Sequence, residues 1–141
     1  MNLIIDIGNS FTKVYLYSNG APKFFKIINS LDELKNSIVS YFKEITHVIV
    51  SDVKRVKIEN VFSMFKGKFI FLVNECRLPF KSRYKTMNSL GDDRIALVNS
   101  AFKKFPNENV LIIDLGTCIT YDFLVEKGEY LGGLISPGFE I

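Results

Sequence analysis

The hydrophobic and polar positions along the chain form short runs that predict strands and helices. Apolar runs bounded by turn residues predict strands at about 2–7, 11–18, 22–28, 47–50, 68–73, 109–115, 118–126 and 129–135. Apolar residues at helical spacing predict amphipathic helices over 31–44, over 56–65 and after Gly91. Ser30 and Glu33 form a capping box at the start of the first helix. The order of these elements predicts an α/β protein with a mixed sheet and flanking helices.

Two of the predicted strands end in the same polar pattern. The first copy covers Asp6 to Lys13, the second covers Asp114 to Asp122, and each reads Asp-x-Gly-polar between two strands. Glycine in such a turn lets another backbone or a ligand come close. The first copy alone is equally consistent with an ordinary hairpin in which Asp6 forms the turn. Repetition of the whole unit is the stronger signal, and two such turns could hold a nucleotide's phosphates and a metal ion.

A third candidate region is the segment 74–90, which shows no periodicity and leads into a predicted helix. Long loops in compact domains are often functional. Asp92 and Asp93 stand at the amino terminus of the helix, where acidic residues complement the helix dipole. The same position suits a carboxylate that takes a proton from an alcohol, with Arg94 as a fork for an anionic substrate. Residue types alone leave both interpretations open.

Composition narrows the possible function classes. The chain has 141 residues, 48% of them hydrophobic, and a net charge of +3. This content supports a real core, and the scattered basic residues do not indicate nucleic-acid binding. No apolar run approaches the roughly 20 residues of a membrane helix, so we expect no membrane partner. Cys76 and Cys118 lack metal-ligand spacing, so we expect reduced cysteines, no zinc and a cytoplasmic protein.

Together these motifs resemble those of the type III pantothenate kinase family, in the actin, sugar-kinase and 70-kDa heat-shock chaperone superfamily. The two Asp-x-Gly turns resemble the phosphate motifs of that superfamily. What resembles the family itself is Tyr84, the run Gly91-Asp92-Asp93-Arg94, and the run Gly132-Gly133-Leu134-Ile135-Ser136-Pro137-Gly138. The resemblance covers almost the whole chain, as the amino-terminal part of a longer family protein. It implies a ribonuclease H-like, actin-type ATPase fold, with a first lobe at 1–105 and an incomplete second lobe at 106–141.

The resemblance also implies a reaction and the residues that perform it. The reaction is ATP-dependent phosphorylation of pantothenate to 4′-phosphopantothenate, the first step of coenzyme A biosynthesis, by a homodimer. Asp93 would be the general base, Asp114 the ligand of a monovalent cation (potassium or ammonium), and Asp6 the partner of magnesium. The implied pantothenate contacts are Tyr84, Gly91, Asp92 and Arg94. The implied ATP contacts are Asp6, Ile7, Gly8, Asn9, Ser10, Phe11, Thr12, Lys13, Gly116, Thr117 and Thr120.

Two positions depart from the family pattern. Met87 stands where the family usually has proline, and Lys13 is an uncommon residue in the first motif. Lys13 could reach a phosphate or face solvent. The family also has relatives described as transcriptional accessory factors, so a non-catalytic protein of that kind on the same scaffold is the alternative function. Loss of the general base or of a phosphate motif would favour that alternative, and the sequence retains both.

Overall fold

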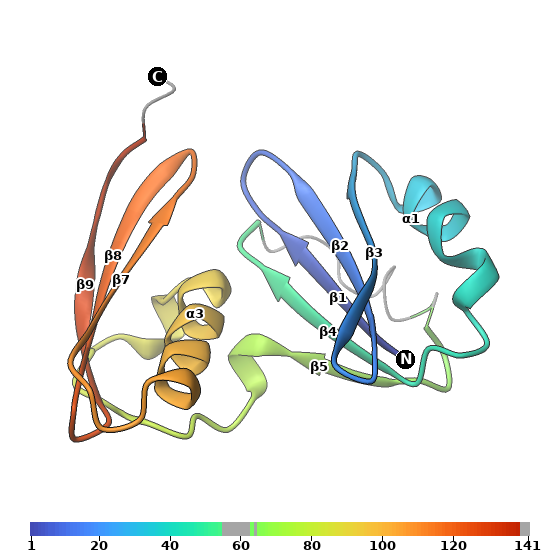
Figure 1. Ribbon diagram of the computed structural model, residues 1–141. Helices are drawn as coiled ribbons and strands as arrows, with labels where there is room; N and C mark the ends of the chain where they lie inside the picture. The colour runs from blue at the N-terminus through green and yellow to red at the C-terminus, as the bar shows by residue number, and fades with distance from the viewer. Residues whose placement is uncertain (55–62, 64, 139–141) are drawn as a thin grey trace. The chain divides into compact units, whose positions relative to one another are not determined.

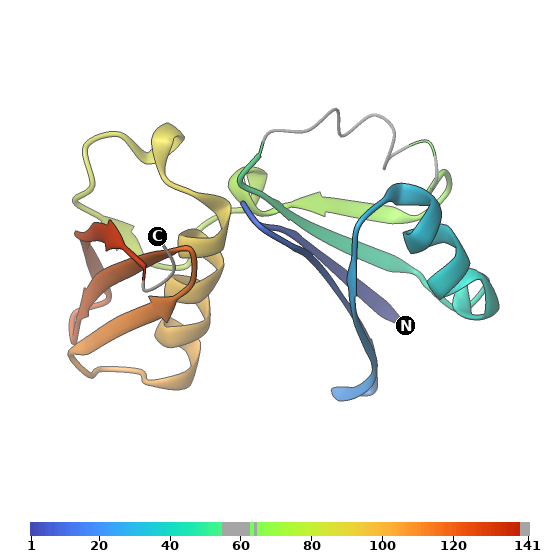
Figure 2. The same ribbon diagram turned by 90° about the horizontal axis from the view of Figure 1, so that it is seen from above.

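The computed structural model describes residues 1–54, 63 and 65–138, and it divides the chain into two compact units. The first unit is Met1–Glu75 and the second is Cys76–Ile141. Figure 1 and Figure 2 show each unit as a sheet with a helix beside it. The helix predicted over 56–65 falls mostly outside the described residues. Compact units and the lobes of a fold are different divisions, so the lobes at 1–105 and 106–141 stay a prediction.

The first unit contains a five-stranded mixed sheet in the order β3-β2-β1-β4-β5. Strands β1, β2 and β3 form an antiparallel meander, and β4 and β5 run parallel to β1. Asn19 and Gly20 turn the chain between β2 and β3 with φ of 51° and 75°, as their sequence predicts. The strand bounds are Asn2–Ile7 (β1), Thr12–Ser18 (β2), Ala21–Ile28 (β3), His47–Asp52 (β4) and Phe69–Leu72 (β5). The predicted mixed sheet is confirmed.

The first helix is shorter than its sequence pattern predicts. Helix α1 covers Leu31–Ile38 and then tightens into a 3₁₀ turn at Val39–Tyr41, so the predicted extension to residue 44 is wrong. Valine and serine are weak helix formers, and a tighter turn is a common helix ending. The capping box is confirmed, because the Ser30 hydroxyl accepts the Glu33 N–H and the Glu33 carboxylate accepts the Asn29 N–H. Among the described residues, no helix is both long and apolar enough to cross a bilayer.

The core of the first unit follows directly from the alternation along its strands. Odd-numbered residues of β1 and even-numbered residues of β2 and β4 point to one buried face, against apolar residues of α1. Each fully buried aliphatic side chain stabilises the fold by about 1.5–3 kcal/mol. The buried cluster is Leu3, Ile5, Ile7, Val14, Leu16, Ile28, Leu34, Ile38, Ile45, Val48, Val50 and Phe65.

The second unit contains a four-stranded sheet in the order β6-β9-β8-β7, with helix α3 packed on β7 and β8. Strands β7, β8 and β9 form the predicted antiparallel meander, while β6 joins β9 in parallel and was not predicted. The segment 74–90 therefore holds a short strand and short 3₁₀ turns. The bounds are Lys81–Ser82 (β6), Asp92–Lys104 (α3), Val110–Leu115 (β7), Cys118–Val125 (β8) and Glu129–Pro137 (β9).

Strand β9 carries a bulge that changes which side chains face α3. Phe123 pairs with Gly132 and Leu124 pairs with Tyr130, so Leu131 is an extra residue without a partner in the register. Without the extra residue, Tyr130 would lie opposite Val125 rather than Leu124, because side chains alternate along a strand. The bulge therefore places Tyr130 opposite Leu124, on the face of β8 that also carries Asp122.

Candidate functional site

The first polar turn closes the hairpin between β1 and β2. Asp6 lies near the end of β1, and the Gly8 N–H donates to the Phe11 carbonyl at 3.0 Å. Residues 9–11 at the tip are exposed. In the register of the sheet, Asp6 stands between Lys13 of β2 and Ser51 of β4. Residues directly opposite share a face, so a carboxylate, an ammonium and a hydroxyl group meet at the carboxyl ends of two parallel strands.

Ser51 is a site candidate that the sequence reasoning missed. It is 6% exposed, and its Oγ has no hydrogen-bond partner in the described part of the chain. A buried hydroxyl without a partner is rare enough to need an explanation such as an unseen ion or ligand. The signal was available, because Ser51-Asp52 follows the apolar run of residues 48–50 as Asp6 follows the apolar run of residues 3–5. Ligands in open α/β sheets bind outside the carboxyl ends of the strands.

The second polar turn joins β7 to β8 in the second unit. The Gly116 N–H donates to the Cys118 carbonyl at 3.1 Å, and Asp114 lies opposite Thr120 in the register. Thr117 is exposed on the turn, whereas Thr120 is buried. The two turns belong to different compact units, so their joint grip on a nucleotide stays a prediction.

Gly138 packs against this second turn from the end of β9. Its N–H donates to the Thr117 carbonyl at 3.1 Å. A Cβ at position 138 would overlap the Gly116 carbonyl oxygen and lie 2.5 Å from that of Thr117. Any larger residue would therefore displace the turn backbone, which explains the glycine at the end of the segment 132–138.

The proposed general base stands on the first turn of α3. Gly91 has extended backbone angles at the N-cap, and the helix starts at Asp92. Asp92 is buried, whereas Asp93 is only half-buried. Asp93 Oδ1 accepts the Arg94 N–H at 2.8 Å, so the carboxylate satisfies an amide in the first turn of the helix. This geometry serves the helix dipole and also holds a carboxylate at the surface.

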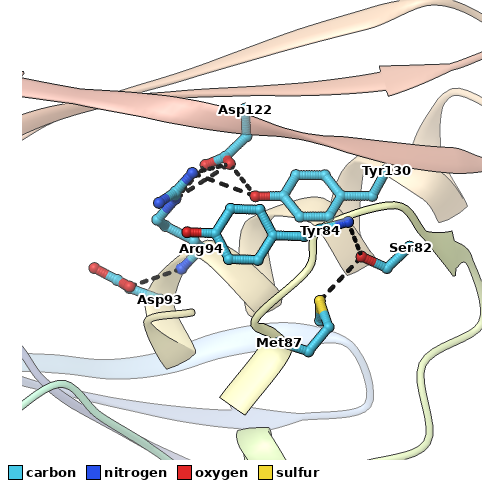
Figure 3. Close-up of polar contacts among 7 residues, drawn as sticks. All are labelled: Ser82, Tyr84, Met87, Asp93, Arg94, Asp122 and Tyr130. Atoms are coloured by element: carbon cyan, nitrogen blue, oxygen red, sulfur yellow. Dashed lines mark hydrogen bonds and ion pairs between the residues drawn. The ribbon is translucent and has the colours of Figure 1, made fainter. Parts of the chain in front are cut away.

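Arg94, the next residue, points inward and is bound on one edge by Asp122 of β8 (Figure 3). Arg94 Nε lies 3.1 and 2.9 Å from the two Asp122 oxygens, and Nη2 lies 2.6 Å from Oδ1. The Tyr130 hydroxyl donates to Asp122 Oδ1 at 2.5 Å. The Arg94 and Asp122 side chains are 6% and 0% exposed. Asp122 occupies the Nε–Nη2 edge, so a substrate anion could reach only the remaining edge of the guanidinium.

The charges in this cluster stabilise one another. Hydrogen bonds to Asp122 raise the pKa of Arg94 above its usual value, against the opposing effect of burial. Burial, followed by the hydrogen bond to Asp122, raises the pKa of Tyr130 well above that of an ordinary tyrosine. Arg94 therefore stays charged and Tyr130 stays protonated as a donor throughout the physiological pH range.

Tyr84, from the segment 74–90, packs against this cluster. Its ring centroid lies 6.0 Å from Arg94 Cζ and 6.1 Å from the ring of Tyr130. Its N–H donates to the Ser82 hydroxyl, which donates to the Met87 sulfur at 3.0 Å. Met87 thus ties its short helical turn to β6. A hollow of about 470 Å³ is lined by Lys85, Thr86, Met87, Asn88 and Ser89.

Gly133 makes room for the ion pair on the sheet. A Cβ there would overlap the Tyr121 carbonyl oxygen and lie 2.7 Å from both Arg94 Nη2 and Asp122 Oδ1. Only glycine lets β9 pass beneath the paired side chains. Within the second unit, the structure therefore brings Tyr84, Asp93 and Arg94 together.

Asp122 and Tyr130 are further residues that the sequence reasoning missed. In the sequence, Asp122 is the last residue of the second polar pattern and receives no role. On β8 it occupies the buried face between Thr120 and Leu124. A charged residue at a core-facing strand position needs a partner, and that was the available signal. No sequence pattern points to Tyr130, because the bulge at Leu131 decides its face.

The described residues contain no group of three or more His, Cys, Asp or Glu side chains that could hold a metal ion. Asp6 and Asp114 each bring one carboxylate to the strand end beside a polar turn. Magnesium is usually held by one or two carboxylates together with substrate phosphates and water. The donor set therefore fits a cation that arrives with a nucleotide, and does not fit an all-protein metal site.

Comparison with known proteins assigns the chain to a family. The family model for type III pantothenate kinase matches residues 2–141. A type III pantothenate kinase from Christiangramia forsetii is 40% identical over the whole chain, and one from Flavobacterium johnsoniae is 35% identical over the whole chain. The chain spans 59% of the length of each of these curated relatives.

Solved structures share the fold. A protein from Campylobacter jejuni described as a Baf family transcriptional activator matches with a TM-score of 0.58 and 23% identity, over 97% of this chain and 55% of its own. A protein from Porphyromonas gingivalis described as an N-acetylglucosamine kinase matches with a TM-score of 0.61 and 15% identity, over 95% of this chain and 47% of its own. These likenesses confirm the predicted actin-type fold class.

Proposed function

The chain belongs to the type III pantothenate kinase family, and we propose that the whole protein phosphorylates pantothenate with ATP. The product would be 4′-phosphopantothenate, which starts coenzyme A biosynthesis. One observation carries the proposal: the family model matches residues 2–141, which include Tyr84, Asp93 and Arg94.

In this proposal Asp93 is the general base for the hydroxyl of pantothenate. Its carboxylate takes the hydroxyl proton as the oxygen forms a bond to the γ-phosphorus, and the bond from that phosphorus to the β,γ-bridging oxygen breaks to release ADP. The half-buried position of Asp93, with Oδ1 held by the Arg94 N–H, supports this role. Tyr84, Gly91, Asp92 and Arg94 are the proposed pantothenate contacts.

We assign the nucleotide to the two polar turns. The residues from Asp6 to Lys13, together with Gly116, Thr117 and Thr120, are the proposed ATP contacts. Among these residues Thr117 is exposed on its turn and Thr120 is buried beside it. Asp6 would hold magnesium and Asp114 a potassium or ammonium ion, and these cations would neutralise phosphate charge. Ser51, opposite Asp6, is a further candidate on the magnesium side.

We also propose that the protein acts as a homodimer in the cytoplasm. The sequence holds only two cysteines, Cys76 and Cys118, far apart and without metal-ligand spacing, which supports a reducing compartment. The alternative, a non-catalytic transcriptional accessory protein, gains no support from the site, because Asp93 and both polar turns are in place.

The test is a coupled assay that follows ADP release by the whole protein with magnesium and ATP. We expect ADP release to depend on pantothenate, phosphopantothenate to appear by mass spectrometry, and activity to fall when potassium is replaced by sodium. Glu108→Gln, which changes an exposed carboxylate, is the matched control for variants of Asp93. ADP release no faster with pantothenate than without it would contradict the proposed substrate.

A further inference from the structure

The cluster of Arg94, Asp122 and Tyr130 joins three elements at one point. Arg94 comes from the first turn of α3, Asp122 from the middle of β8, and Tyr130 from β9 beside the bulge. Asp122 is fully buried and accepts bonds from both other side chains. Figure 3 shows the Arg94 guanidinium between Asp122 and the ring of Tyr84, with Asp93 at the other end of the Arg94 residue.

Stability gives little reason for a buried ion pair here. Taking two charges out of water costs free energy that their attraction only partly repays, and apolar residues of similar volume often hold a structure at least as well. The ion pair fixes the orientation of the Arg94 guanidinium, because two parallel N–H···O bonds hold its plane. The residue so fixed is the neighbour of Asp93 and the support of the Tyr84 ring.

We propose that Asp122 is a positioning residue for the phosphoryl-acceptor site. It orients the Arg94 side chain. Through Arg94 it also positions the Tyr84 ring and the first turn of α3, which carries Asp93. Asp122 itself touches neither proposed substrate nor the reacting atoms. The inference rests on the proposed function for its reaction, and on the contacts of Arg94 for its geometry.

Two other features of the second unit serve the same arrangement. The bulge at Leu131 turns Tyr130 toward α3, and its hydroxyl donates to Asp122 at 2.5 Å. This bond stabilises the carboxylate in the orientation that Arg94 needs. Gly133 leaves the space above β9 that the paired side chains fill. Tyr130 and Gly133 should therefore affect the reaction through Asp122 and Arg94.

The kinetic test compares Asp122→Asn, Tyr130→Phe and the exposed control Glu126→Gln in the whole protein. Misplacing a catalytic group by about 1 Å costs on the order of 10²-fold, so we expect that loss in kcat/KM for pantothenate with Asp122→Asn. Tyr130→Phe removes the hydrogen bond that the hydroxyl donates to Asp122 and the longer one that it accepts from Arg94 Nη2, so we expect a loss of about tenfold. The KM for ATP should stay within about twofold in every variant, because none of the substituted residues is a proposed ATP contact.

A purely structural role predicts a different pattern. It would lower the thermal midpoint of the variants but leave the KM for pantothenate and kcat unchanged per folded molecule, and this result would overturn the proposal. Tyr130→Phe keeps the ring contacts to Phe80 and Tyr84, so it tests the idea even if Asp122→Asn folds poorly.

Hydrogen exchange tests the positioning independently of the substrate. The amides of Arg94 and Ile95, bound to Asp93 Oδ1 and the Gly91 carbonyl, should exchange faster in Asp122→Asn and not in Glu126→Gln. Unchanged exchange would overturn the positioning role. Absence of pantothenate turnover in the unmodified protein would instead overturn the proposed function, and exchange would still decide the role of Asp122.

Discussion

The two compact units differ in the kind of side chain that they bury. The first unit buries an apolar cluster in which Leu3, Leu16 and Val48 are fully inaccessible. The second unit places an ion pair, Arg94 with Asp122, beside its apolar core. The other face of its sheet is open, with Leu111, Ile113 and Leu115 exposed by 55%, 51% and 67%. The first unit thus has an ordinary apolar core, whereas the second unit buries charged side chains beside Asp93 and leaves the other face of its sheet exposed.

An apolar core and a buried ion pair should tolerate substitution differently. A domain interior can be repacked with other apolar residues of the right volume. A buried ion pair cannot be altered on one side without leaving a charge unpaired. We therefore expect substitutions in the first unit to change stability, and substitutions around Arg94 to change stability and chemistry together.

The largest effect should come from Asp93→Asn in the second unit. The amide cannot take the hydroxyl proton, so turnover should fall by about 10²–10⁴-fold. The ATP dissociation constant should hardly change, because Asp93 is assigned to the acceptor. Single-turnover kinetics with a separate nucleotide-binding measurement checks this. Weakened ATP binding with turnover preserved at saturation would place Asp93 in the nucleotide site.

Next in size is Leu16→Ala in the core of the first unit. Leu16 is fully buried, so urea unfolding should show a loss of about 2–5 kcal/mol. The matched control is Leu134→Ala in the second unit, where the side chain is 73% exposed and we expect a change within about 0.5 kcal/mol. Equal losses at the two positions would break the contrast between the units.

Arg94→Lys should have an intermediate effect. An ammonium cannot make the two parallel bonds to Asp122, so we expect a loss of about 1.5–3 kcal/mol in the free energy of unfolding. The KM for pantothenate should rise as well, through lost positioning or a lost contact to the substrate carboxylate. Denaturant unfolding and steady-state kinetics measure the two effects. A variant with the parent's KM would leave Arg94 with a structural role alone.

The smallest effect on stability should come from Ile113→Lys on the open face of the second sheet. Ile113 is half exposed, so the free energy of unfolding should change by no more than about 0.5 kcal/mol.

The 141-residue chain itself should associate through this apolar face and should be inactive as a kinase. The charge should reduce that association in light scattering, whereas Glu126→Lys should not. A monodisperse, active parent chain would contradict this expectation.

Much of the fold was predictable because local patterns agree with the final structure. The apolar runs that predict strands at 2–7 and 11–18 form β1 and β2 in the structure. The capping box at Ser30 begins α1 as expected, although the end of that helix was placed too late. The proposed site residues came from the two polar turns and the run Gly91 to Arg94. Their roles stay predictions, but the structure shows the polar residues at two hairpins, on the turns and the adjoining strand ends, and the acidic pair at a helix start.

The sequence by itself determined the order of the strands other than β6, the two described α-helices and the family. Those features depend on the side-chain period within one element and on motifs of adjacent residues. Only the tertiary structure decided the partners of Arg94, because Asp122 and Tyr130 lie far along the chain and meet it across strands. It also decided the face of Tyr130, since one extra residue in β9 reverses the alternation from which a sequence pattern is read.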